Sequence, residues 1–207
     1  MKSIFKHLLV FAGLALAISS FNGCGGQGGN AVNNANAPGN SNANGGVAAS
    51  DSTEYPPLPS GLANAEFENL DGSKFKPSDK KGKVVLMNLW GIWCGPCRAE
   101  MPELIAMTDR YAGKDFEIIG LNIGDEDNAP ESVDKIKKFA EDMKLNYTLA
   151  RSPRESTDEF YKITKKSVVP QSILFDRQGR LRGVFSGAGQ GVYQSLRDTV
   201  DKVVNEQ

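Results

Sequence analysis

Apolar residues along the chain gather either in short continuous runs or at helical spacing, and polar or glycine-rich segments separate these stretches. Continuous apolar runs cover residues 83–90 (KVVLMNLW) and 116–123 (FEIIGLNI), a pattern typical of buried strands. Apolar side chains three and four residues apart recur in 131–145 and 191–205, a pattern typical of amphipathic helices. The pattern therefore predicts a domain that combines strands with helices.

Two further stretches predict β-hairpins. Within 66–75, short β segments flank Asp71-Gly72, and an Asp-Gly pair between such segments is a strong hairpin feature. A second stretch follows Pro170, turns at 176–179 (DRQG) and ends at Phe185. One hairpin is therefore expected before the run at 83–90 and the other near the end of the chain.

The N-terminal residues follow a different pattern. Lys2 and Lys6 precede an apolar run at 8–18, which is shorter than the ~20 residues that a helix needs to cross a bilayer. A basic start before a short apolar run is typical of an export signal, and the cysteine just behind it resembles the lipobox of bacterial lipoproteins. We expect residues 1–23 to be a lipoprotein signal peptide and Cys24 to be lipidated.

Phe21 and Asn22 depart from the lipobox pattern, which prefers leucine and a small residue at these places. The alternatives are a soluble exported protein with an unmodified thiol, or an uncleaved membrane anchor. Lipidation of Cys24 would leave Cys94 and Cys97 as the only free pair, which would explain an odd number of cysteines in an exported protein.

The segment behind Cys24 is rich in Gly, Asn and Ala. Within 25–50, Val32 and Val47 are the only large aliphatic residues, and no aromatic residue occurs. Such a tract buries too little apolar surface to offset the entropy lost on ordering. We expect 24–57 to be a flexible tether, with an r.m.s. reach of about 30 Å, and 58–207 to be the folded domain. Self-association of the Asn-rich segment is the alternative use.

Composition and charge narrow the possible functions. The chain is 40% hydrophobic and 24% charged, with a net charge of −1 and no basic stripe, so we expect no nucleic-acid partner. Removal of 1–23 takes away Lys2, Lys6 and His7, the single histidine, and leaves 22 basic against 25 acidic residues. A chain without histidine excludes Cys–His hydrolysis and His-ligated metal centres, and we expect neither a metal nor a cofactor.

Candidate chemistry lies at Trp93-Cys94-Gly95-Pro96-Cys97, between a predicted strand and a predicted helix. The first turn of a helix offers unpaired N–H groups and a partial positive charge, and thiols there have pKa values of about 3.5–7.5 instead of about 8.5. Pro96 suits this turn because its missing N–H is not needed. Cys94 is therefore the candidate nucleophile and Cys97 the resolving thiol. Half of a zinc site, or a buried pair of thiols, is the alternative.

Residues 83–104 (KVVLMNLWGIWCGPCRAEMPEL) resemble the thioredoxin superfamily, and within it the TlpA/ResA-like, membrane-tethered thiol-disulfide oxidoreductases of bacterial envelopes. The resemblance implies a thioredoxin fold: a central mixed β-sheet with helices on both faces, preceded by an extra N-terminal β-hairpin. It implies reduction of disulfides in partner proteins through Cys94 and Cys97, with electrons from a membrane thiol reductase. Apocytochrome c is a frequent client in this family.

The resemblance also implies a docking site. The proline at the place of Pro170 is cis in thioredoxins and faces the cysteines. With the backbone of Val169 it would form the rim on which a client segment pairs. We expect Trp93 to cover the dithiol and Trp90 to serve in packing. The expected substrate-binding residues are Trp93, Gly95, Pro96, Val169 and Pro170, although Gln171-Ser172 stand where most relatives have Thr-Thr.

A proton acceptor is expected beside the thiols. Asn88 stands where thioredoxins often bury an aspartate, and it cannot titrate. Glu100 matches a glutamate that TlpA/ResA-like proteins frequently carry three residues after the second cysteine. A partly desolvated carboxylate there would have a raised pKa and could take the proton of Cys97. The alternative is that Glu100 only complements the positive end of the helix.

Two rival functions use the same cysteines. Peroxiredoxins, which are thiol-dependent peroxidases, carry a threonine three residues before the reactive cysteine, where this chain has Gly91. A non-catalytic lipoprotein that holds Cu(I) or a peptide is the second rival, because two thiolates can bind Cu(I). Peroxide turnover and metal titration distinguish these functions from disulfide exchange.

Overall fold

The computed structural model describes residues 55–206. The expected signal peptide at 1–23, the expected lipidation site Cys24 and the first 31 residues of the expected tether (24–54) lie outside the described residues.

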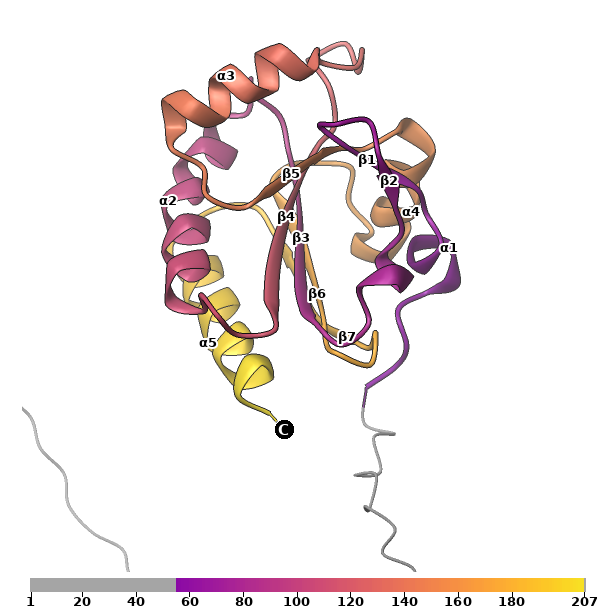
Figure 1. The fold of residues 1–207 in the computed structure, drawn as a ribbon, viewed down its shortest axis with the longest axis vertical. Helices are drawn as coiled ribbons and strands as arrows, with labels where there is room; N and C mark the ends of the chain where they lie inside the picture. The colour runs from indigo at the N-terminus through magenta and orange to yellow at the C-terminus, as the bar shows by residue number, and fades with distance from the viewer. Residues whose placement is uncertain (1–54, 207) are drawn as a thin grey trace, which may run out of the picture. The chain divides into compact units, whose positions relative to one another are not determined.

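A seven-stranded mixed sheet forms the centre of the domain, in the order β2-β1-β5-β4-β3-β6-β7 (Figure 1). Strand β3 pairs in parallel with β4, and β4 in parallel with β5, whereas the other neighbours are antiparallel. The predicted mixed sheet is confirmed. The strands are β1 (Phe67–Asn69), β2 (Lys74–Phe75), β3 (Val84–Trp90), β4 (Phe116–Asn122), β5 (Thr148–Arg151), β6 (Gln171–Phe175) and β7 (Leu181–Ser186).

Helices cover both faces of this sheet (Figure 1). Helices α2 and α5 lie on one face, and α1 and α4 lie on the other. Within 55–206, no helix is both long and apolar enough to span a bilayer. The helices are α1 (Ser60–Ala63), the 3₁₀ helix η1 (Pro77–Lys80), α2 (Gly95–Arg110), α3 (Val133–Met143), α4 (Arg154–Thr164) and α5 (Gln190–Asn205).

All seven residues of β3 are buried, because this strand lies inside the sheet with helices on both sides. Successive side chains of a strand point to opposite faces. Met87 accordingly packs in the cluster on the α1 and α4 side, while Leu86 packs with Leu104 and Leu196 on the α2 and α5 side. The continuous apolar run of 83–90 therefore reflects burial on both faces.

The extra N-terminal hairpin is confirmed. Strands β1 and β2 are antiparallel, with Phe67 opposite Phe75, and Gly72 supplies the left-handed turn residue at φ +88°. Strand β1 also pairs with β5, which joins the hairpin to the edge of the central sheet. The second hairpin is confirmed as the antiparallel pair β6–β7.

The polypeptide enters the domain along the edge strand β7. The carbonyl of Pro56 accepts a hydrogen bond from the N–H of Leu181 (2.9 Å), and Pro57 forms an isolated antiparallel bridge with Arg180. Residues 55–57 thus belong to the folded part, ahead of the predicted start at residue 58. A proline lacks the N–H group but still offers its carbonyl to an open sheet edge.

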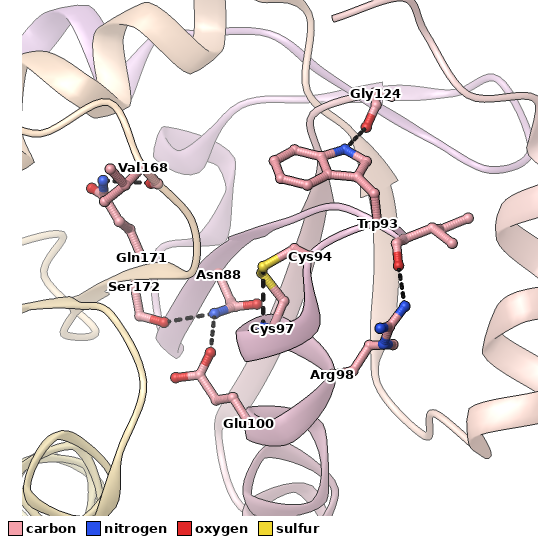
Figure 2. The surroundings of a disulfide bond; sticks show 11 residues. Asn88, Trp93, Cys94, Cys97, Arg98, Glu100, Gly124, Val168, Gln171 and Ser172 are labelled. Carbon is pink, nitrogen blue, oxygen red and sulfur yellow. Dashed lines mark hydrogen bonds between the residues drawn. A yellow bond between two sulfur atoms is a disulfide. The ribbon is translucent and has the colours of Figure 1, made fainter. Parts of the chain in front are cut away.

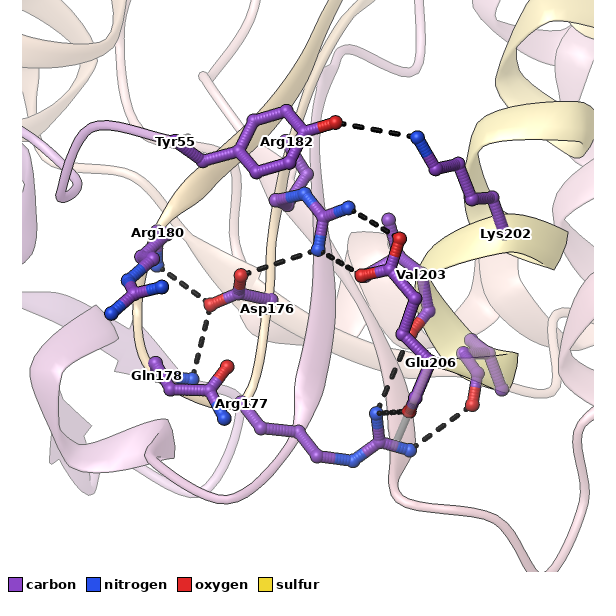
Figure 3. A network of polar contacts seen from close by, with 10 residues as sticks. Tyr55, Asp176, Arg177, Gln178, Arg180, Arg182, Lys202, Val203 and Glu206 are labelled. Carbon is purple, nitrogen blue, oxygen red and sulfur yellow. Dashed lines mark hydrogen bonds and ion pairs between the residues drawn. The ribbon is translucent and has the colours of Figure 1, made fainter. Parts of the chain in front are cut away.

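Arg182 is the centre of a polar network that fixes this entry point (Figure 3). Its buried guanidinium binds both carboxylate oxygens of Glu206 (2.5 and 2.7 Å) and one oxygen of Asp176 (3.3 Å). These bonds hold the pKa of Glu206 below its ordinary value. The ring of Tyr55 stacks on the same guanidinium at 4.0 Å. The network therefore ties Tyr55, the β6–β7 turn and the C-terminal end of α5 together.

Candidate redox site

Cys94 and Cys97 form a disulfide bond at the start of α2 (Figure 2). Cys94 is the residue that caps the helix, and its Sγ accepts a hydrogen bond from the N–H of Cys97 at 3.1 Å. Both cysteines are buried, whereas Gly95 and Pro96, the first two helical residues, are exposed. The backbone thus directs an N–H group at the sulfur that we expect to be the nucleophile. The same donor stabilises a thiolate when the disulfide is reduced.

Trp93 lies next to the disulfide and is 39% exposed. Its indole Nε1–H donates to the carbonyl of Gly124 at 2.9 Å, so the loop behind β4 holds the ring (Figure 2). A Cβ atom added at Gly91 would lie 2.6 Å from this ring. The ring in this position therefore leaves no room for a threonine at residue 91. Trp90 is buried and stacks on Phe139, which confirms its packing role.

The loop before β6 lies beside the cysteines. The Val169–Pro170 peptide bond is cis, as predicted. Val169 packs against the cluster that contains both cysteines, and Val168 is 52% exposed. Among the described residues, the backbone N–H and C=O groups of Val169 have no hydrogen-bond partner. They are therefore available to a further strand.

Gln171 holds this loop in place. Its side chain is buried, and its Nε2 donates to the carbonyls of Val168 (2.6 Å) and Lys166 (3.0 Å). Both carbonyls precede the cis-proline, so the Gln171 amide group holds the loop before Pro170 against the start of β6. Sequence reasoning noted Gln171 only as a departure from relatives. Its long polar side chain at the start of a strand was the available indication of a bond back to the loop.

Glu100 is buried in the second turn of α2, three residues after Cys97. Burial raises the pKa of its carboxyl to about 7, while a hydrogen bond from Asn88 Nδ2 to Oε2 (3.0 Å) acts in the opposite direction. Residues three apart on a helix share a face, with Cβ atoms about 5–6 Å apart. This carboxyl group can therefore take up and release a proton near neutral pH beside Cys97. No acidic residue lies in the first turn of α2, where it would complement the helix dipole.

Asn88 and Ser172 complete the surroundings of Glu100. Asn88 Nδ2 donates both to Glu100 and to Ser172 Oγ (2.9 Å), and all three side chains are buried (Figure 2). Sequence reasoning set Asn88 aside because it cannot titrate, and it noted Ser172 only as a departure from relatives. A polar residue inside an apolar central strand was the available indication for Asn88.

A cavity of about 590 Å³ is lined by residues at the ends of β4 and β5 and in α4. Gly124, which holds the indole ring, and Ser167, two residues before Val169, both lie on its wall. The cavity thus shares Gly124 with the hydrogen bond of Trp93, whereas neither Trp93 nor the cysteines line it. Within the described part of the chain, no three His, Cys, Asp or Glu side chains gather as a metal site would require.

Taken together, the central mixed sheet, the disulfide at a helix start and the neighbouring cis-proline define a redox domain of the thioredoxin fold. The chain belongs to the AhpC/TSA family, which it matches over residues 60–184.

Within this family, the chain is similar to thiol-disulfide oxidoreductases named ResA. The chain is 33% identical over 140 residues to the thiol-disulfide oxidoreductase ResA of Bacillus thuringiensis, covering 68% of this chain and 75% of the relative. It is 27% identical over 121 residues to ResA of Geobacillus thermodenitrificans, covering 58% of this chain and 64% of that protein, slightly less than two thirds. The predicted ResA-like resemblance is confirmed.

Solved structures agree on the fold. A secreted thiol-disulfide isomerase from Corynebacterium glutamicum superimposes with a TM-score of 0.59 at 27% identity, covering 70% of this chain and 86% of the other. The thioredoxin fold is therefore confirmed.

Proposed function

We propose that this protein is a thiol-disulfide oxidoreductase of the bacterial cell envelope that reduces disulfide bonds in partner proteins. The observation that carries the proposal is the Cys94–Cys97 disulfide, held at the start of α2 beside the cis-proline loop and the buried carboxyl group of Glu100. The Gly-Pro pair between the cysteines matches thioredoxin, whose potential of about −270 mV makes it a reductant.

The reaction starts from the reduced protein. The Cys94 thiolate attacks one sulfur of a client disulfide, a Cys94–client bond forms, and the second client sulfur leaves as a thiolate that takes a proton from solvent. Cys97 then loses its proton to Glu100, and its thiolate attacks Cys94 Sγ. The mixed disulfide breaks, the Cys94–Cys97 bond forms, and the leaving client sulfur receives the proton. Two electrons have then passed from the protein to the client.

Docking uses the surface around the disulfide. The free backbone groups of Val169 can pair with an extended client segment, which places a client sulfur over the exposed end of α2. The half-exposed ring of Trp93 and the side chain of Val168 provide apolar contacts on either side. Gly95 and Pro96 present exposed backbone at the same surface.

The cellular setting follows from the N-terminal sequence. Signal peptide cleavage after residue 23 and lipidation of Cys24 would place the domain on a membrane outside the cytoplasm, with 24–54 as a tether. The dithiol is renewed by a membrane electron donor of the thiol-reductase type. Clients are disulfide-containing proteins, with apocytochrome c as the client that the family resemblance favours.

A Cys97→Ser variant tests this function. Without the resolving thiol, the mixed disulfide on Cys94 has no internal route to resolution, so we expect covalent adducts with client proteins in the envelope and with insulin chains in vitro. Non-reducing electrophoresis followed by mass spectrometry identifies the adducts and the linked cysteine. The Cys94→Ser/Cys97→Ser double variant is the control and should form none.

Other outcomes would favour a rival function. Absence of adducts from a folded, exported Cys97→Ser variant would contradict the proposal. Rapid hydrogen peroxide turnover with a thiol donor would indicate a peroxidase instead. Tight Cu(I) binding by the reduced protein, without reduction of insulin, would indicate the metal-binding lipoprotein.

Gln171→Ala is expected to weaken client docking. The loop before Pro170 loses two hydrogen bonds to the carbonyls of Lys166 and Val168, each worth about 1 kcal/mol. We expect kcat/KM for insulin reduction to fall about tenfold, mainly through KM, because the cysteines are not touched. Gln178→Ala is the matched control, since Gln178 is exposed in the β6–β7 turn. An unchanged KM, or an equal loss in the control, would contradict this role.

A further inference from the structure

We propose that Asn88 is a positioning residue for this reaction: its amide holds the Glu100 carboxyl group in a fixed orientation beside Cys97 and connects it, through Ser172, to the strand behind the docking proline. This inference rests on the proposed reductase function, but the geometry on which it stands is independent of turnover.

The three side chains come from three separate elements. Asn88 lies in β3, Glu100 in α2 and Ser172 in β6, and they meet on the face of the sheet that α2 covers (Figure 2). Asn88 is opposite Ser172 in the antiparallel β3–β6 register, so the strand pairing itself sets their separation. Both N–H groups of one amide are thereby engaged, one with Glu100 Oε2 and one with Ser172 Oγ. An amide held at two points has little freedom to rotate.

The charge environment makes this donor important for Glu100. Besides burial, the Asn88 amide is the group that acts on the Glu100 carboxyl, which in turn raises the pKa values of Tyr147 before β5 and Tyr193 of α5. Glu103 also raises the pKa of Tyr193 but does not shift that of Glu100. Within residues 55–206, no Lys or Arg side chain shifts the pKa of the Glu100 carboxyl. Among the described residues, the Asn88 N–H is the one hydrogen-bond donor that offsets the cost of burying this charge.

The fixed donor also selects the atom that carries the proton. Asn88 donates to Oε2, so Oε1 is the carboxyl oxygen left to take up and release a proton. Protonation at Oε1 leaves the bond from Asn88 to Oε2 in place. The side chain therefore changes charge without reorganising the buried network, which is the condition for rapid proton transfer in a packed interior.

The bond to Ser172 adds a link to client docking. Ser172 lies in β6, two residues after Pro170. The backbone therefore leads directly from the proposed docking residues, Val169 and Pro170, to Ser172. A shift of β6 on client binding would move Ser172 Oγ and, with it, the amide that orients Glu100. The proton acceptor is thereby aligned with the strand that receives the client.

The test is a titration of the oxidised full-length protein, in which the disulfide does not ionise. The ¹³C carboxyl resonance of Glu100, assigned by its absence in Glu100→Gln, should have a midpoint of about 7 in the wild type. In Asn88→Ala we expect the midpoint to rise by about one pH unit, since the carboxylate loses a charge-assisted hydrogen bond. In the nearly isosteric Asn88→Asp, which also serves if the alanine variant does not fold, a second carboxylate should raise it further.

Turnover should follow the same shift. The ionised fraction of Glu100 at pH 7 would fall about fivefold in Asn88→Ala, and so should the rate of the Cys97 step, with recovery to within about twofold at pH 9. In a Glu100→Gln background, Asn88→Ala should add no further loss. Asn122→Ala is the matched control, because Asn122 is a second buried asparagine that donates to a buried glutamate, Glu131, at 2.8 Å. It should leave the Glu100 midpoint unchanged.

The outcomes separate this inference from the reductase function. An unchanged Glu100 midpoint in both Asn88 variants, or a rate loss that is equal at pH 7 and pH 9, would overturn the positioning role even if the wild type reduces insulin. A shifted midpoint in a protein that reduces no disulfide would leave the positioning of Glu100 intact and overturn the proposed function.

Discussion

Replacing Cys94 by serine is expected to lower insulin reduction by about 10³-fold or more, to the level of the chemical donor alone. A hydroxyl group with an ordinary pKa is not ionised near neutral pH, so the helix start has no anion to stabilise and the first attack cannot occur. The measurement is the precipitation rate of reduced insulin with limiting dithiothreitol, for the wild type, Cys94→Ser and Cys24→Ser. The Cys24 variant should retain wild-type turnover, because that residue lies outside the redox domain.

An ultraviolet titration at the thiolate absorption band completes this prediction. The N–H of Cys97 that now reaches Cys94 Sγ should keep the pKa of the reduced Cys94 thiol below about 8.5. A Cys94 thiol that titrates at an ordinary pH, together with insulin reduction that survives in Cys94→Ser, would show that the chemistry lies elsewhere in the chain.

Replacing Glu100 by glutamine is expected to change how stability depends on pH. Burial raises the folded-state pKa of this carboxyl from 4.5 to about 7, so its protonated form favours folding below about pH 4.5 and this contribution is lost as pH rises through 7. A shift of this size corresponds to about 3 kcal/mol in the free energy of unfolding. The free energy of unfolding of Glu100→Gln, relative to that of the wild type, should therefore rise by about 3 kcal/mol as the pH is raised from 4.5 to 8.

Urea unfolding of both oxidised proteins at a series of pH values measures this difference. Glu103→Gln is the control, because Glu103 lies on the same helix as Glu100 but is partly exposed and forms an ion pair with Arg197 of α5. A constant difference between Glu100→Gln and wild type across this pH range would mean that Glu100 has an ordinary pKa. It would then be a poor proton acceptor for Cys97 near neutral pH.

Much of the fold could be read from local patterns. The apolar runs at 83–90 and 116–123 coincide with β3 and β4 to within a residue, because a strand buried on both faces needs continuous hydrophobicity. Asp71-Gly72 marked its hairpin because few residues tolerate the turn. Within α2, Met107 is buried, whereas Thr108, the next residue, is half-buried. The Thr108 hydroxyl bonds to its own helix at the Leu104 carbonyl.

The parts that could not be predicted depend on distant pairing. The two cysteines and Glu100 lie within one short stretch, so a motif could identify them. Asn88 and Ser172 are 84 residues apart, and only the β3–β6 register brings them together. Likewise, the pairing of the three-residue strand β1 with β5 is set by the sheet and not by its own sequence.

The network around Arg182 has a consequence for how the molecule is presented. Tyr55 is fixed where β7 begins, next to the start of β3, whereas Cys94 follows the end of β3. Seven strand residues span about 20 Å, so Tyr55 and the sulfur of Cys94 lie at opposite ends of the strands. If the residues before Tyr55 serve as the proposed tether, the tether therefore joins the domain at the end of the sheet remote from Cys94 and leaves the redox end open to clients.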